Sequence, residues 1–123
     1  MLASSLTLLG LAALLGAALA LVGAKAAGKP PSAWLASLHG IVAVSGFALL
    51  LAALIEGPAR GAATGTQSFG AIAAVLLLLA ACLGITSLLL HIRRRRLPGF
   101  WASAHAVIAV SGFVILAAYV VLG

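Results

Sequence analysis

Acidic side chains are almost absent from this sequence, which contains no aspartate and a single glutamate, Glu56. A Ser-His-acid triad and an HExxH zinc motif each need a carboxylate beside a histidine, so hydrolases of these kinds are excluded. The single cysteine, Cys82, has no partner for an intramolecular disulfide or for a CxxC metal site. Because it lies within an apolar run, we expect its thiol to be buried and unreactive.

Charged residues of any sign are also scarce, at 7% of the 123 residues, whereas 65% are hydrophobic. Soluble domains carry about 25% charged residues, so this chain lacks the polar surface that a water-soluble globule needs. The net charge of +6 could suggest nucleic acid as a partner. The basic residues, however, stand at the ends of apolar runs, where membrane topology places them, and we expect no nucleic-acid binding.

Four uncharged apolar stretches dominate the chain, at residues 2–24, 33–55, 68–92 and 99–122. A helix rises about 1.5 Å per residue, so each stretch can span the roughly 30 Å of bilayer hydrocarbon. None alternates with a period of two, and backbone polar groups in lipid must pair within the segment, so helices are the predicted form. The sequence therefore predicts an all-α integral membrane four-helix bundle, a single transmembrane domain over residues 1–123.

The Lys and Arg residues predict how the chain is oriented. Lys25, Lys29 and the run Arg93–Arg96 fall on one side of the membrane, and only Arg60 falls on the other. The positive side of a membrane protein faces the cytoplasm. We therefore expect the loops after the first and third helices to be cytoplasmic and both termini to lie outside, in a bacterial inner membrane.

An internal repeat links the second and fourth helices. LHGIVAVSGF at residues 38–47 matches AHAVIAVSGF at residues 104–113, at a constant offset of 66 residues (105 minus 39). This predicts a duplicated helical hairpin with repeat units of about 1–56 and 67–123. The second and fourth helices would then run in the same direction, related by a pseudo-two-fold axis along the membrane normal. His39 and His105 would lie at equal depth.

The two repeated histidines are the candidate functional residues. An ionisable side chain in hydrocarbon costs a few kcal/mol without a partner, so it marks a functional site by default. Imidazole is the commonest metal ligand, and haem iron accepts one axial ligand on each face. Small residues four and seven positions after each histidine would leave room for a flat macrocycle: Ala43, Gly46, Ala109 and Gly112. Arg93 would pair with a haem propionate.

With His39 and His105 on a four-helix membrane bundle, the chain resembles the small four-helix membrane b-type cytochromes. The resemblance covers mainly the second and fourth helices. It implies one non-covalent haem b per chain, which exchanges electrons with quinone or with a partner subunit. Those cytochromes often carry two haems, whereas the outer half of this chain has no histidine. A CxxCH motif is absent, which excludes covalent c-type attachment.

Other roles for the histidines and for the chain remain open at this stage. The histidines could pair structurally across a helix interface, or they could form a proton or ion site. The chain could be a non-catalytic accessory subunit that stabilises a larger membrane complex through its Ala/Gly faces. A small multidrug exporter is disfavoured because it needs an intramembrane carboxylate, and Glu56 stands at a helix end. Expected partners are membrane lipids, quinone, and either other membrane subunits or a second copy of the chain.

Overall fold

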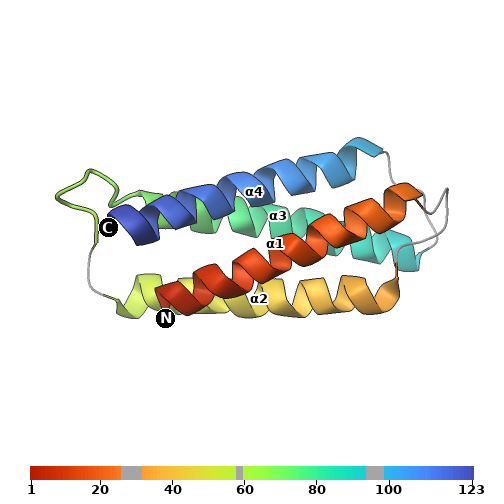
Figure 1. Cartoon of the computed structure of the whole chain (residues 1–123), viewed down its shortest axis with the longest axis horizontal. Helices are drawn as coiled ribbons and strands as arrows, with labels where there is room; N and C mark the ends of the chain where they lie inside the picture. The colour runs from red at the N-terminus through yellow and green to blue at the C-terminus, as the bar shows by residue number, and fades with distance from the viewer. Residues whose placement is uncertain (26–31, 58–59, 94–98) are drawn as a thin grey trace. The chain divides into compact units, whose positions relative to one another are not determined.

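The computed structural model describes residues 1–25, 32–57, 60–93 and 99–123; Lys29, Arg94–Arg96 and the side chain of His91 lie outside this description. The chain forms four helices (Figure 1): α1 Leu2–Lys25, α2 Ala33–Glu56, α3 Phe69–Ile92 and α4 Gly99–Leu122. Each end lies within one residue of the sequence prediction. All four helices are long and apolar enough to cross a membrane, and the described ranges contain no strand. The all-α integral membrane class is confirmed.

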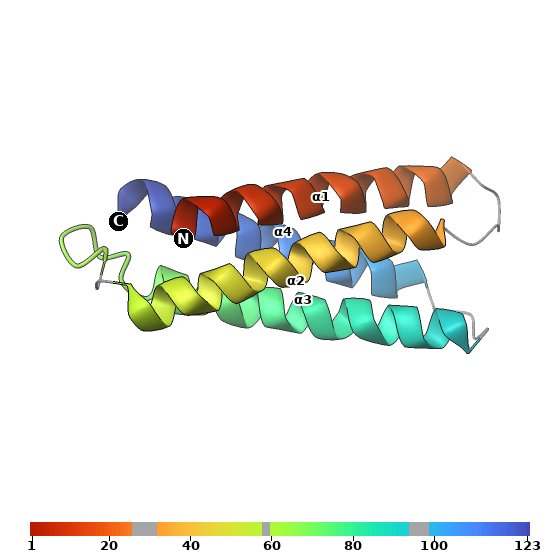
Figure 2. The same cartoon turned by 90° about the horizontal axis from the view of Figure 1, so that it is seen from below.

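The chain divides into two compact units, Met1–Ala53 and Leu54–Gly123. The first holds α1 with nearly all of α2, and the second holds α3 with α4. We call these helix pairs the first and second hairpin and describe each by itself. Consecutive helices reverse direction in both (Figures 1 and 2). The two helices of each predicted hairpin are therefore antiparallel.

The two hairpins bury matching helix positions, apart from Gly70, whose counterpart Leu2 is only half-buried. The buried residues of α2 recur in α4 at the offset of 66, and those of α1 recur in α3 at an offset of 68 (84 minus 16). The matched pairs are Ser5 and Ala73, Leu9 and Leu77, Ala12 and Ala80, Gly46 and Gly112, Leu50 and Leu116, and Ala53 and Tyr119. The duplication predicted from α2 and α4 thus extends to α1 and α3.

At one level of the helix pair, the large and the small residue are on opposite helices in the two hairpins. Gly70 lies against the ring of Tyr119, since a Cβ added to Gly70 would be 2.9 Å from the Tyr119 Cε1 atom. The corresponding positions of the first hairpin hold Leu2 and Ala53. Because interiors are close-packed, a bulky side chain on one helix requires a small one opposite it. Both hairpins thus keep one large and one small residue at this level.

The loop before α3 closes through two left-handed glycines, Gly61 at φ 80° and Gly65 at φ 71°. The Gly61 carbonyl accepts a hydrogen bond of 2.9 Å from the Thr66 backbone N–H. A Cβ at Gly61 would also run into Thr66, so both backbone angle and space require glycine there. Arg60 donates from Nη2 to the Val120 carbonyl at 3.4 Å, which places a cation at the negative C-terminal end of α4.

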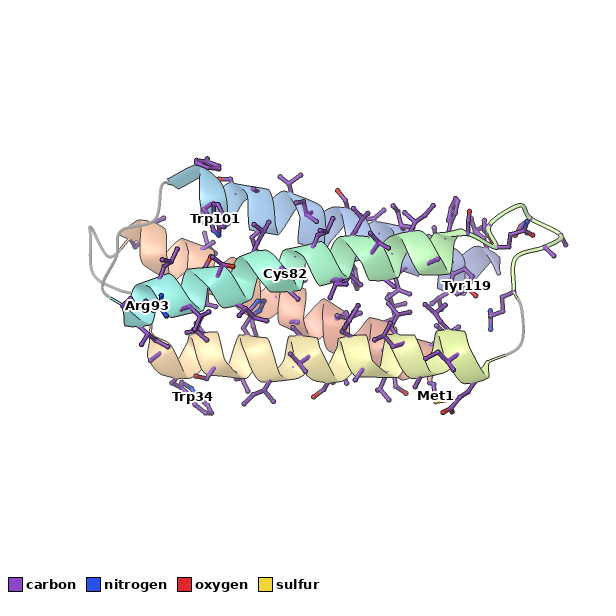
Figure 3. The ribbon with its side chains drawn as sticks, turned by 180° about the vertical axis from the view of Figure 1, so that it is seen from behind. Met1, Trp34, Cys82, Arg93, Trp101 and Tyr119 are labelled. Carbon is purple, nitrogen blue, oxygen red and sulfur yellow. The ribbon has the colours of Figure 1, made fainter. Side chains whose placement is uncertain are left out.

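The expectation that Cys82 is buried was wrong. Its side chain is exposed on α3 rather than buried, and Figure 3 labels it midway along that helix. The corresponding residue of α1 is Leu14, which is also exposed. The apolar run around Cys82 gave no hint of this, because a membrane helix is apolar on its lipid-facing side as well.

Candidate functional site

His39 of α2 makes a hydrogen bond to α1. It is the seventh residue of α2, and its Nδ1 atom lies 2.8 Å from the backbone carbonyl oxygen of Ala12 on α1. The ring stands against Gly16, one turn after Ala12: a Cβ added to Gly16 would be 3.2 Å from His39 Cε1 and 3.5 Å from Nδ1. The imidazole therefore contacts a backbone oxygen and a glycine of α1.

His105 repeats this arrangement in the second hairpin. It is also the seventh residue of its helix, α4, and its Nδ1 atom lies 2.8 Å from the Ala80 carbonyl oxygen on α3. A Cβ added to Gly84 would be 3.2 Å from His105 Cε1 and 3.5 Å from Nδ1. The two histidines thus share their partner types, their distances and their place in the hairpin.

The hydrogen-bond partner determines which ring nitrogen carries the proton. A carbonyl oxygen can only accept, so Nδ1 of His39 and of His105 must be the donor. In the neutral imidazole the lone pair then belongs to Nε2. Metal-ligating histidines commonly donate their other ring N–H to a carbonyl or carboxylate, which fixes the tautomer and the ring orientation. Both rings have the chemistry of an Nε2 ligand.

The sequence analysis placed Gly46 and Gly112 beside a cofactor, but in the structure both glycines pack against leucines of the neighbouring helix. A Cβ at Gly46 would be 2.9 Å from Leu9 Cγ and 3.1 Å from Leu8 Cβ, both on α1. A Cβ at Gly112 would likewise be 3.0 Å from Leu77 Cγ. These two glycines therefore allow the helices of each hairpin to approach closely, and their space is filled. Small residues at helical spacing serve this packing in membranes generally.

The remaining candidate residues have fewer contacts. Ala43 and Ala109 are half-buried on the helix faces that carry the histidines. Arg93 is exposed just beyond the end of α3. Figure 3 shows Arg93 at the same end of the second hairpin as Trp101, while Tyr119 lies at the other end. The cation is thus available at the end of the hairpin where α4 begins.

Other polar contacts also join the two helices of each hairpin. In the first, Ser5 donates from Oγ to the Gly46 carbonyl at 2.8 Å. In the second, Ala73 takes the place of Ser5, and Trp101 donates from Nε1 to the Leu83 carbonyl at 3.2 Å. The two hairpins therefore differ in these secondary contacts and agree in the histidine contact.

Sequence reasoning missed the groups that hold the histidines, namely Ala12, Gly16, Ala80 and Gly84. A signal for them does exist. The segments LLGLAALLG at residues 8–16 and LLLLAACLG at residues 76–84 align at the offset of 68, with Ala and Gly at the two contact positions. A search at the offset of 66 alone does not find this match.

Metal cages of the usual kind are not part of this site. Over the described ranges, no group of three His, Cys, Asp or Glu side chains is placed to hold a metal ion. A haem iron needs only two protein ligands, because the macrocycle supplies the other four nitrogens. Protein-family models, curated proteins and solved structures were compared with this chain, and none of them matches it.

Proposed function

We propose that this chain is a membrane b-type haem protein that works in electron transfer, with one non-covalent haem b per chain. His39 and His105 supply the two axial ligands through Nε2. The observation that supports this most is the repeated bond from Nδ1 to a backbone carbonyl, made at 2.8 Å in both hairpins. That bond gives two half-buried imidazoles the tautomer and the second contact that metal-ligating histidines have.

The bound haem would supply an iron that takes up and releases one electron. The residues of the chain hold two half-buried imidazoles on long helices, each against a backbone carbonyl and a glycine of the neighbouring helix. Arg93, exposed at the end of α3, would pair with a propionate, since guanidinium groups bind carboxylates well. We propose that Ala43 and Ala109 lie beside the macrocycle. Gly46 and Gly112 are left out of this proposal, because leucine side chains occupy the space next to them.

We further propose that the haem lies in the cytoplasmic half of a bacterial inner membrane. Lys25 and the arginine run from Arg93 would face the cytoplasm, with both termini outside. A haem in one half does not cross the membrane alone, so it would exchange electrons with quinone or with a partner subunit. Labelling from one side of cysteines introduced at Ala62 and at Arg93 tests the orientation. Cytoplasmic reaction at Ala62 would contradict it.

Haem content tests the function most simply. The protein purified from haem-replete cells should carry one haem b per chain, removable by acid extraction because no covalent attachment exists. Folded, haem-free protein from such cells would contradict the proposal. The haem-to-protein ratio is measured from the extracted haem and from the amino-acid content of the same sample.

A haem-free result would favour a second function, that of a non-catalytic accessory subunit. One observation supports this alternative. The outward faces of α2 and α4 carry exposed serines at matching positions: Ser37, Ser45, Ser103 and Ser111. Nothing lies within 4 Å of a Cβ added to Gly40. Small and hydroxyl side chains are what membrane helices use to pack against further helices.

A further inference from the structure

We infer that Gly16 and Gly84 are positioning residues that set the tautomer of His39 and His105 by uncovering a backbone carbonyl. The inference deepens the proposed function. It rests on that function only for the role of Nε2 as the iron ligand, not for the tautomer itself. Each glycine lies four residues after the alanine whose carbonyl accepts the histidine hydrogen bond. The same arrangement of histidine, carbonyl and glycine occurs in both hairpins.

The geometry of a helix explains why glycine is needed at these positions. Every Cα–Cβ bond tilts toward the helix N-terminus, so a side chain covers the turn before its own Cα. A side chain at residue 16 would therefore lie over the carbonyl of residue 12, and one at residue 84 over the carbonyl of residue 80. A carbonyl oxygen has two lone pairs, so one remains for the imidazole N–H while the helix uses the other.

The distances set the size of the effect. A Cβ at Gly16 or Gly84 would be 3.2 Å from the histidine Cε1, so alanine there would displace the ring by a few tenths of an ångström. Valine adds methyl groups that would occupy the volume of the ring itself. We therefore expect Gly16→Ala to weaken the Nδ1 hydrogen bond and Gly16→Val to remove it. The same series applies to Gly84 and His105.

The tautomer can be read directly by nitrogen NMR of the full chain, labelled with ¹⁵N in the histidine rings, haem-free and in lipid nanodiscs. In the wild type, the two intramembrane rings should each be protonated at Nδ1 and unprotonated at Nε2. Gly16→Val should abolish the Nδ1–H signal of His39 and leave that of His105 unchanged. Gly84→Val should do the reverse. Should a valine variant fail to fold, the alanine variant supplies the smaller shift of the same ring.

Two glycines supply matched controls. Gly23 on α1 and Gly40, next to His39, have nothing within 4 Å of an added Cβ, so Gly23→Val and Gly40→Val should leave both rings unchanged. A wild-type ring protonated at Nε2 alone, or a His39 signal unmoved by Gly16→Val and Gly16→Ala, would overturn the inference. Retained tautomers in a chain that binds no haem would sink the proposed function and leave this inference intact. Bound haem in a chain whose wild-type rings are protonated at Nε2 alone would overturn this inference and leave haem binding in place.

Discussion

Replacing either His39 or His105 with alanine should yield protein that is folded but has lost its bis-histidine haem spectrum. Each variant removes one axial ligand, so the sharp bands of a low-spin bis-imidazole haem should disappear from the reduced-minus-oxidised spectrum. The fold should persist, because each substitution deletes one hydrogen bond to a carbonyl, a contact worth about 0.6 kcal/mol in a membrane protein. The helical circular dichroism spectrum checks the fold of the same samples.

Two controls separate ligation from a structural role. His91→Ala removes the third histidine of the chain and should leave the haem bands in place. Added imidazole should enter the space left by His39→Ala or His105→Ala and restore the low-spin bands, because a free ligand can replace an axial one. If one variant alone kept the full wild-type spectrum, that histidine would not be a ligand.

Substitution of Gly46 or Gly112 by valine should cause the largest losses of stability. The added Cβ of Gly46 would lie 2.9 Å from Leu9 Cγ and 3.1 Å from the Leu9 backbone nitrogen. A backbone atom cannot rotate away, so the helices must separate, which also strains the Ser5 hydrogen bond to the Gly46 carbonyl. Overpacking costs about 1–3 kcal/mol, and we expect the upper end of this range.

Gly112→Val should cost less than Gly46→Val, because the three atoms nearest to an added Cβ at Gly112 are side-chain atoms of Leu76 and Leu77, whereas those at Gly46 include a backbone nitrogen. The matched control is Gly40→Val, on the open face of α2, which should change the free energy of unfolding by a few tenths of a kcal/mol. Unfolding in mixed micelles, followed by circular dichroism, measures all three. Equal losses for Gly46→Val and Gly40→Val would contradict the close approach of α1 and α2.

The helices could be predicted from the sequence to within one residue because bilayer thickness dictates their length. An uninterrupted apolar run of this size has one structure that satisfies its backbone in lipid. The repeat around His39 and His105 was visible because histidine and phenylalanine are rare in this chain, with three and four residues, so that their coincidence at one offset marks the alignment. These residues identified the two helices that repeat, and they remain the candidate side chains of the proposed site.

The contacts of those side chains could not be predicted in the same way. Small residues four and seven positions after a histidine fit a cofactor face and a helix-packing face equally well, and Gly46 and Gly112 proved to be packing positions. The partners Gly16 and Gly84 lie on Ala- and Leu-rich helices, where chance matches are common. Their repeat also has a different offset, because the connection between equivalent positions is two residues longer in the first hairpin (68 minus 66).

The reduced-minus-oxidised visible spectrum of the wild-type protein, recorded on the sample whose haem content is known, tests most directly whether two imidazoles of this chain share one iron. We predict the narrow bands of a six-coordinate, low-spin b-type haem, at one haem per chain. A broad five-coordinate spectrum, or a colourless sample of fully helical protein, would contradict that ligation.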